Sequence, residues 1–244
     1  MKRGWKAGAF LLALVMSAGL LAGCMEKADV VETLPQFEKE LVEGEKIAVV
    51  TVRDYGQFKI RFFPEQAPKA VENFIGLAEK GFYDELNFHR VVEDFMIQGG
   101  DPKGDGSGEE SFWGDPFEDE FSPELRNFYG AVSMANSGED SNGSQFFIVQ
   151  NSDHYTDEQL DSVEESNSKK MAEKVREKYK EVGGAPWLDD AHTVFGQVFE
   201  GMDVVDKIAA CKKTTVTDAY GQSEESKPVD EVLIEKVEIV EYKK

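Results

Sequence analysis

Eight short runs rich in β-branched and aromatic residues recur along the chain, and they restrict it to a mainly β fold. The clearest run covers residues 57–63, where Phe58, Ile60 and Phe62 alternate with polar residues. An alternation with period 2 is typical of a strand that buries one face. Together the runs predict strands over residues 47–52, 57–63, 88–92, 95–98, 130–134, 145–149, 193–199 and 232–240.

Two segments have helical spacing instead. Pro68 is suited to open a helix because its fixed φ matches the first helical position, and Gly81 is well placed to end that helix. Residues 203–210 predict a second short helix, with Val204 and Ile208 on one face. Eight strands can close into a barrel whose interior is filled by side chains.

The N-terminus carries the features of an export signal. Three basic residues occur within the first six positions, and fifteen uncharged residues rich in Leu and Ala follow at 7–21. This run is shorter than the roughly 20 residues that span a bilayer, so we predict a signal peptide at 1–23. The sequence LAGC at 21–24 resembles the bacterial lipobox, in which the cysteine, here Cys24, is lipidated. A cleaved signal with an incidental cysteine and an uncleaved anchor helix are the alternatives.

The chain is strongly acidic, with 48 Asp and Glu residues against 27 Lys and Arg, a formal net charge of −21 at pH 7. This charge argues against binding to nucleic acid through phosphates and against a polybasic contact with a membrane. Residues 24–45 are polar and acidic, and we predict that they form a flexible tether between a lipid on Cys24 and the domain. Two cysteines cannot supply a disulfide scaffold.

One highly charged segment, 152–184, interrupts the series of strands. Met171, Val175, Tyr179 and Val182 form a narrow apolar stripe at helical spacing, and the rest is mainly Lys and Glu. We predict a helical insertion that lies on the barrel surface through this stripe. A dedicated partner-binding device is the alternative.

General catalytic motifs are absent from the sequence. The histidines His89, His154 and His192 do not have the spacing of a zinc-binding helix, and no Gly-x-Ser-x-Gly elbow occurs. The glycine-rich stretch at 101–109 is surrounded by acidic residues and lacks the calcium-loop pattern, which favours an ordinary surface loop. We therefore expect no metal and no cofactor.

Two further stretches are more specific. Residues 88–101 place Arg90 among aromatic and apolar residues on adjoining strands, and residues 133–149 carry a second aromatic strand. Composition alone favours a structural interpretation, in which Arg90 is a surface charge and the barrel core contains Phe95, Met96, Phe146 and Phe147.

These two stretches resemble the cyclophilin family of peptidyl-prolyl cis-trans isomerases. Four more segments resemble it in the same order: APKAVENF at 67–74, GFYD at 81–84, WLDDAHTVFG at 187–196 and GMDVV at 201–205. The similarity covers residues 46–242 and is interrupted by the insertion. It implies the family's fold, a closed eight-stranded antiparallel barrel capped by two helices, which agrees with the independent strand count.

The resemblance also implies which residues act. The family's catalytic arginine matches Arg90, and the glutamine that orients it matches Gln98. The sequence departs from the family pattern in two places: the insertion ends just before Trp187, and residues 92–94 replace a family turn that contains Pro-Gly. The proline pocket matches Phe95, Met96, Phe147 and Leu188; the residues that hold the peptide match Ala135, Asn136 and Gln145; the rim matches Trp187 and His192.

This residue set suits the chemistry of an X-Pro bond. Rotation breaks amide resonance against a barrier of about 18–20 kcal/mol. In the twisted transition state the prolyl nitrogen regains a lone pair, so a donor aimed at it binds that state selectively. Arginine suits this role because it stays charged and its donors form a rigid fork.

The combined prediction is a lipid-anchored isomerase at the extracytoplasmic face of a bacterial membrane, carrying palmitate or a similar chain. We expect a monomer that acts on proline-containing unfolded or exported polypeptides and assists their folding. A tethered binding module that uses the same pocket without turnover is the alternative. A secreted hydrolase with another fold is a remote third alternative.

Overall fold

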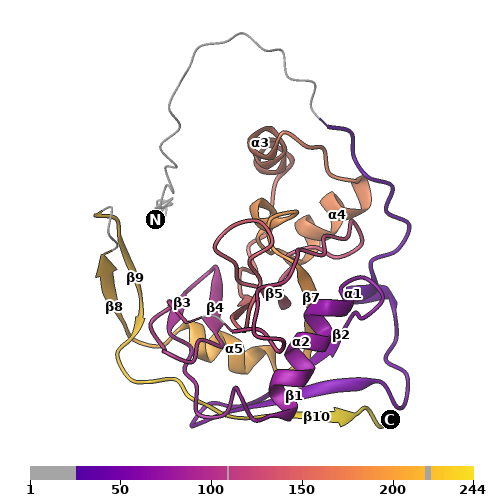
Figure 1. Ribbon diagram of the computed structural model, residues 1–244. Helices are drawn as coiled ribbons and strands as arrows, with labels where there is room; N and C mark the ends of the chain where they lie inside the picture. Colours follow the sequence, from indigo (N-terminus) through magenta and orange to yellow (C-terminus); the bar gives the residue numbers. More distant parts are fainter. Residues whose placement is uncertain (1–25, 109, 218–220) are drawn as a thin grey trace.

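The computed structural model of the chain describes residues 26–108, 110–217 and 221–244 (Figure 1). The predicted signal at 1–23 and the predicted lipidation site Cys24 lie outside these residues. None of the helices in the described ranges is long and apolar enough to cross a membrane.

Eight strands form one antiparallel sheet in the order β10-β1-β2-β7-β5-β6-β4-β3. Two helices, α2 (Pro68–Glu79) and α5 (Met202–Ala209), pack against it. All the predicted strands and both predicted helices are confirmed, with small shifts at their ends. The strands are β1 (Lys46–Val52), β2 (Gly56–Phe62), β3 (Arg90–Val92), β4 (Met96–Gly99), β5 (Ala131–Met134), β6 (Phe146–Val149), β7 (Val194–Glu200) and β10 (Ile234–Glu241).

Local sequence explains where several of these elements end. The turn between β1 and β2 holds Asp54 at a φ of 66° and Gly56 at a φ of 121°. Short polar residues and glycine tolerate positive φ best, so this turn suits its sequence. Helix α2 begins at Pro68 and stops before Gly81, whose φ of 69° suits a residue without a Cβ atom.

The sheet is open, so the prediction of a closed barrel is not confirmed. Strands β10 and β3 are its two edges. The chain segments just before these two strands contact each other: Asn87 and Leu233 form an isolated antiparallel bridge, and Phe88 N donates to Val232 O at 2.9 Å. Glu85 N also donates to Ile234 O, and Ile234 N donates to Leu86 O, both at 2.7 Å. The contact between the two edges is therefore made by the chain just before β3, and the three residues of β3 itself form no ladder with β10.

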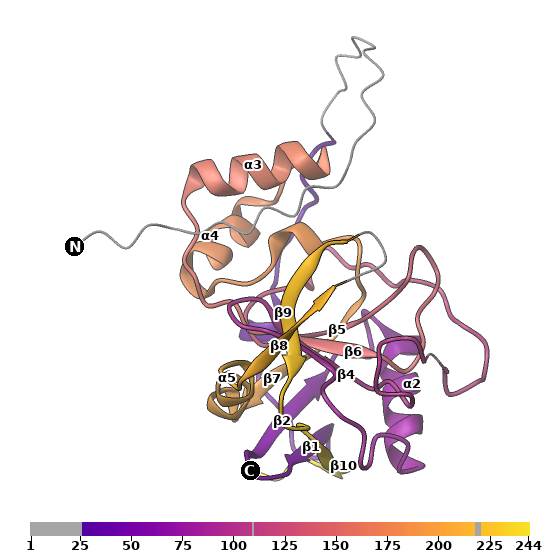
Figure 2. The ribbon, with the colours of Figure 1, turned by 90° about the vertical axis from the view of Figure 1, so that its left-hand side faces the viewer.

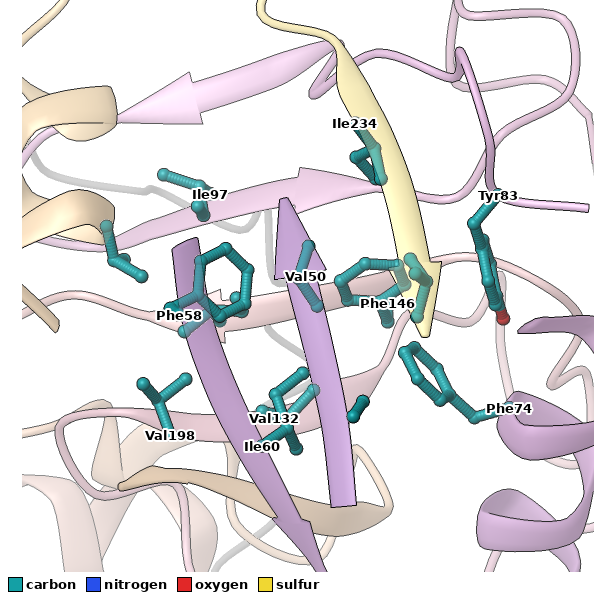
Figure 3. Close-up of a cluster of buried hydrophobic side chains, with 14 of the residues drawn as sticks. Val50, Phe58, Ile60, Phe74, Tyr83, Ile97, Val132, Phe146, Val198 and Ile234 are labelled. Atoms are coloured by element: carbon teal, nitrogen blue, oxygen red, sulfur yellow. The ribbon is translucent and has the colours of Figure 1, made fainter. Parts of the chain in front are cut away.

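The inner face of the sheet carries one large apolar core (Figure 3). Phe74 of α2 packs against Tyr83 and Phe146, with ring centroids 4.9 and 5.3 Å apart. Ile208 of α5 belongs to the same cluster, and α5 contacts β2, the strand that carries Phe58. Figure 3 shows Phe74 and Phe58 at opposite ends of the core, so each helix covers one end.

Residues 26–45 pack against the domain, whereas their acidic composition predicts a flexible tether. The short helix α1 (Pro35–Glu38) lies in this segment, and Leu34 before it is fully buried. Gln36 is also buried, and its Nε2 donates to Gln197 Oε1 at 2.9 Å. A buried apolar side chain and a buried, hydrogen-bonded amide make this segment part of the folded domain.

The predicted insertion is helical and contains two helices, α3 (Asp157–Asn167) and α4 (Glu173–Val182), which lie together beyond the sheet (Figure 2). Val175 and Tyr179 of the predicted stripe are buried in one cluster with Leu34 of the N-terminal segment. The stripe therefore contacts the N-terminal segment as well as Phe128, just before β5. No local pattern in the insertion or in the N-terminal segment predicts this pairing.

A buried ionic network joins the insertion to the segment that carries several predicted site residues. The 3₁₀ turn η1 (Pro186–Leu188) is followed directly by Asp189. Arg126 approaches Asp189 at 3.8 Å and Asp190 at 2.7 Å, and the Tyr179 hydroxyl donates to Asp189. The insertion thus supports the segment beside the candidate site, although it supplies none of the predicted site residues.

Replacing Tyr179 with phenylalanine should destabilise the protein by about 1–3 kcal/mol, because it removes a donor from a buried carboxylate. The hydroxyl oxygen lies 2.9 and 2.8 Å from the two oxygens of Asp189, whose side chain is 8% exposed. Denaturant unfolding measures the change. Tyr242→Phe is the matched control, because within the described ranges its hydroxyl has no hydrogen-bond partner, and it should change stability by less than about 0.5 kcal/mol. Equal losses in the two variants would contradict this role.

A second, two-stranded sheet is missing from the predicted elements. Strands β8 (Lys213–Thr217) and β9 (Ser223–Pro228) pair antiparallel (Figures 1 and 2), and β9 contacts β3. Their sequences, KTTVT and SEESKP, are mostly exposed and have no alternating apolar face. The period-2 signal that identifies a half-buried strand is therefore absent from both.

Candidate active site

Backbone pairing places Arg90, Gln98 and Phe147 side by side on neighbouring strands. Arg90 of β3 pairs with Gln98 of β4, which pairs with Phe147 of β6. Successive residues of a strand point to opposite faces, and Val91 and Ile97 belong to the core. Arg90, Gln98 and Phe147 therefore share the face of the sheet that is turned away from that core.

A chain of hydrogen bonds orients the Arg90 guanidinium. Arg90 Nη1 donates to Gln98 Oε1 at 3.5 Å, and Gln98 Nε2 donates to Gln145 Oε1 at 3.0 Å. Gln145 Nε2 donates in turn to the carbonyl oxygens of Gly106 and Gly108 at 3.2 and 2.7 Å. The glycine-rich loop, which the sequence presents as an ordinary surface loop, anchors the far end of this chain.

Asp101 organises that loop. Its carboxylate accepts hydrogen bonds from the backbone N–H groups of Lys103, Asp105 and Gly106 at 2.8, 3.0 and 2.5 Å. Burial opposes ionisation, but these donors outweigh it and hold the pKa of Asp101 below its ordinary value. The loop carbonyls that receive Gln145 are thereby held in place. Within the described ranges, no group of three or more His, Cys, Asp or Glu side chains is arranged to hold a metal ion.

The four residues of the predicted proline pocket form one apolar cluster: Phe95, Met96, Phe147 and Leu188. Met96 and Phe147 are buried, whereas Phe95 and Leu188 are half-buried, so the cluster presents an apolar surface to solvent. Ala135 packs against the same cluster.

Arg90 reaches the edge of this apolar cluster. Its Cζ atom is 5.7 Å from the centroid of the Phe95 ring, and its Nη1 is 3.9 Å from Met96 Sδ. The first distance lies within the range of a cation–π contact. A permanently charged donor therefore lies against an apolar surface.

Trp187 and His192 border the apolar cluster from the segment that follows the insertion. The Trp187 ring is 40% exposed, with its centroid 5.8 Å from that of Phe95, and the His192 ring meets Phe147 edge-on at 5.2 Å. His192 Nδ1 lies 3.0 Å from Met134 O. Burial lowers the pKa of His192 below its ordinary value, which favours the neutral ring.

Asn136 and Ala135 complete the predicted set. Asn136 Nδ2 donates to Ala191 O at 2.8 Å, and Ala135 N donates to Gln145 O at 3.0 Å. The predicted site residues other than Asn136 are thus linked to one another by hydrogen bonds, ring contacts or the apolar cluster, and Asn136 binds the backbone of Ala191, next to His192. Their individual roles in catalysis stay predictions.

A family model described as cyclophilin type peptidyl-prolyl cis-trans isomerase/CLD matches residues 47–239, a range that contains all of these residues. The chain belongs to the cyclophilin family. Its enzyme class is therefore peptidyl-prolyl cis-trans isomerase, as the ordered motifs predict.

Staphylococcal relatives resemble this cyclophilin over nearly their whole length. A protein of Staphylococcus saprophyticus, by name a peptidyl-prolyl cis-trans isomerase, is 43% identical over 212 residues, which cover 85% of this chain and 98% of the relative. A protein of Staphylococcus epidermidis with the same name is 44% identical, with the same coverage of both chains.

Solved cyclophilins share the fold. The crystal structure of a cyclophilin-type isomerase from Cryptosporidium parvum aligns with a TM-score of 0.60 and 29% identity, covering 81% of this chain and 99% of that one. A second structure of the same protein, determined in the presence of the dipeptide Ala-Pro, aligns with a TM-score of 0.59. These likenesses confirm a mainly β cyclophilin fold.

This cyclophilin has one charged contact at Arg90 that the motifs do not predict. Glu224 of β9 accepts hydrogen bonds from Arg90 Nε and Nη2 at 2.9 and 3.0 Å. Glu224 lies 134 positions after Arg90, in a polar strand beyond the last matched motif at 201–205. No signal in the sequence marks this glutamate among its many acidic neighbours.

Proposed function

We propose that this cyclophilin isomerises X-Pro bonds of exported polypeptides, with Arg90 as the catalytic residue and the apolar cluster as the binding surface for the proline ring. One observation carries the proposal: the Arg90 guanidinium lies 5.7 Å from the Phe95 ring and 3.9 Å from Met96 Sδ. Its donors therefore border the surface on which a proline ring would bind.

Arg90 acts on the prolyl nitrogen as the amide twists. The planar amide offers no lone pair at nitrogen, but the twisted amide does, so the hydrogen bond strengthens in the transition state. A charged donor held against apolar residues is worth more than the same donor in water. Gln98 accepts from Nη1 and so orients this donor before the substrate arrives. Rotation breaks no covalent bond, so the reaction needs no nucleophile.

The other site residues hold the peptide. Met96 and Phe147 hold the proline ring in place through apolar contacts while the preceding residue rotates. Gln145 and Asn136 offer polar groups to the peptide backbone, and Trp187, exposed at the rim, contacts the chain where it leaves the site. All of these residues belong to one chain, so we propose that the monomer is active.

A protease-coupled assay on a proline tetrapeptide tests the activity. A second assay follows the refolding of a protein whose slow phase is a proline isomerisation, which takes roughly 10–100 s without a catalyst. We expect acceleration in both assays. Peptide binding without acceleration would contradict the proposal and would favour a tethered binding module that uses the same surface.

We further propose that a lipid on Cys24 anchors the protein at the extracytoplasmic face of a bacterial membrane. The basic N-terminus, the short apolar run and the LAGC sequence support this location. Glu26 pairs with the insertion, because its N donates to Ser168 O at 2.9 Å and its O accepts from Lys170 N at 3.0 Å. Since Glu26 lies two positions after Cys24, this anchor would hold the insertion close to the bilayer.

Replacing Cys24 with serine should move nearly all of the protein out of the membrane fraction or leave it unprocessed, because serine has no thiol to carry the lipid. Cell fractionation and the mass of the mature chain measure this outcome. Cys211→Ser is the matched control and should stay in the membrane fraction. A Cys24→Ser protein that is retained at the membrane with the mature mass would rule out the anchor.

A further inference from the structure

The Arg90 guanidinium is held by a carboxylate from outside the eight-stranded sheet. Glu224 of β9 accepts from Arg90 Nε and Nη2 at 2.9 and 3.0 Å, a bidentate and charge-assisted pair. The two side chains are 31% and 29% exposed, so the contact is partly shielded from solvent. Such a pair fixes the plane of the guanidinium as well as its position.

The strand that carries Glu224 is itself tied to the domain. Lys213, at the start of β8, donates from Nζ to Ala209 O and Cys211 O at 2.6 and 2.9 Å. At the same end of the β8–β9 pair, Val229 N donates to Lys212 O at 2.9 Å. Strand β9 also contacts β3, the strand of Arg90. The base of the β8–β9 pair is thus tied to the segment after α5, and the contact between β9 and β3 places Glu224 beside Arg90.

The donors that Glu224 occupies are not those that face the apolar cluster. Glu224 binds Nε and Nη2, whereas Nη1 lies 3.9 Å from Met96 Sδ and 3.5 Å from Gln98 Oε1. Gln98 and Glu224 thus hold two different edges of one planar group. The edge left toward the apolar cluster is the one that a prolyl nitrogen could reach.

We propose that Glu224 is a positioning residue of the isomerase site, which holds the guanidinium so that Nη1 points toward the apolar cluster. This inference rests on the proposed catalytic role of Arg90. Within the described ranges, the side-chain hydrogen bonds of Glu224 go to Arg90 and none goes to the apolar cluster, so Glu224 acts through Arg90. Without Glu224, the guanidinium keeps only the long hydrogen bond to Gln98 and its weak contacts with Met96 and Phe95, and it samples other orientations.

Substitutions at Glu224 should change turnover more than substrate affinity. We expect Glu224→Ala to lower kcat about tenfold, since small displacements of a catalytic group are costly, with KM within about twofold. Glu224→Asp should recover part of the loss because it keeps a carboxylate. Glu224→Gln, which keeps the size and one acceptor oxygen, should fall between native and alanine. Glu225→Gln is the matched control: it removes the same charge from an exposed neighbour on β9 and should leave kcat unchanged.

A double-mutant cycle with Arg90→Ala separates positioning from a general structural effect. If Glu224 acts through Arg90, then Glu224→Ala should cause no further loss on the Arg90→Ala background. The same loss on both backgrounds would overturn the inference. So would native or faster turnover of the single Glu224→Ala variant, and faster turnover would mean that the carboxylate competes with the peptide for Arg90. Native turnover of the single Arg90→Ala variant would instead refute the proposed catalytic role of Arg90. Failure of the Glu224 inference and failure of the proposed function therefore give different results.

Discussion

Arg90→Ala should lower turnover on a proline tetrapeptide by about 10²–10³-fold, the usual cost of removing one donor that acts in the transition state. The melting temperature should change little. The side chains of Arg90 and Glu224 are 31% and 29% exposed. Ion pairs that solvent can reach contribute about 0–1 kcal/mol to the free energy of unfolding. The freed Glu224 carboxylate can be hydrated, so no buried charge is left behind.

Arg90→Lys is the conservative control for this prediction. It keeps the charge but loses the fork that lets Arg90 contact Gln98 and Glu224 together, so only part of the activity should return. Protease-coupled kinetics and thermal unfolding of both variants provide the measurements. Near-native turnover of Arg90→Ala would refute the mechanism and favour the binding-module function.

Phe147→Ala should damage both stability and peptide binding. The Phe147 side chain is 4% exposed and packs with Met96 in the apolar cluster and edge-on against His192. Truncating a buried phenylalanine costs about 3–5 kcal/mol because it removes apolar burial and leaves a cavity. The same truncation removes one member of the apolar cluster on which a proline ring would bind, so peptide affinity should fall.

Trp187→Ala is the matched aromatic control for Phe147→Ala. Trp187 is 40% exposed, so its loss should cost about 1 kcal/mol or less while it still weakens contacts at the rim. Denaturant unfolding and titration of a proline peptide measure the two effects separately. A Phe147→Ala variant with native stability would show that its ring does not support the sheet as the packing indicates.

The main elements of this cyclophilin follow from local sequence. The alternation at Phe58, Ile60 and other positions of β2 reports burial on one face, because side chains of a strand point to opposite faces in turn. Prolines and glycines mark the helix ends for a similarly local reason: Pro68 and Gly81 restrict or permit φ at their own positions.

The candidate site was predictable for a different reason. Ordered motifs identified Arg90, Gln98 and the apolar cluster, and the strand register then places them together, since Arg90 pairs with Gln98 and Gln98 pairs with Phe147. What the motifs lack is the second partner of the guanidinium. Glu224 comes from a strand with no apolar face, so neither periodicity nor a motif distinguishes it from the other acidic residues.

The sequence alone therefore predicted the strands of the main sheet, helices α2 and α5, the family and a set of candidate site residues, because each of these leaves a local pattern in residue type. Tertiary packing added the open edge of the sheet, the docking of residues 26–45 and the Glu224 contact. Gln36 meets Gln197 across 161 positions and Arg90 meets Glu224 across 134. Polar side chains like these leave no periodic pattern in the sequence from which the partner could be predicted. Their pairing depends on how the folded chain brings distant segments together.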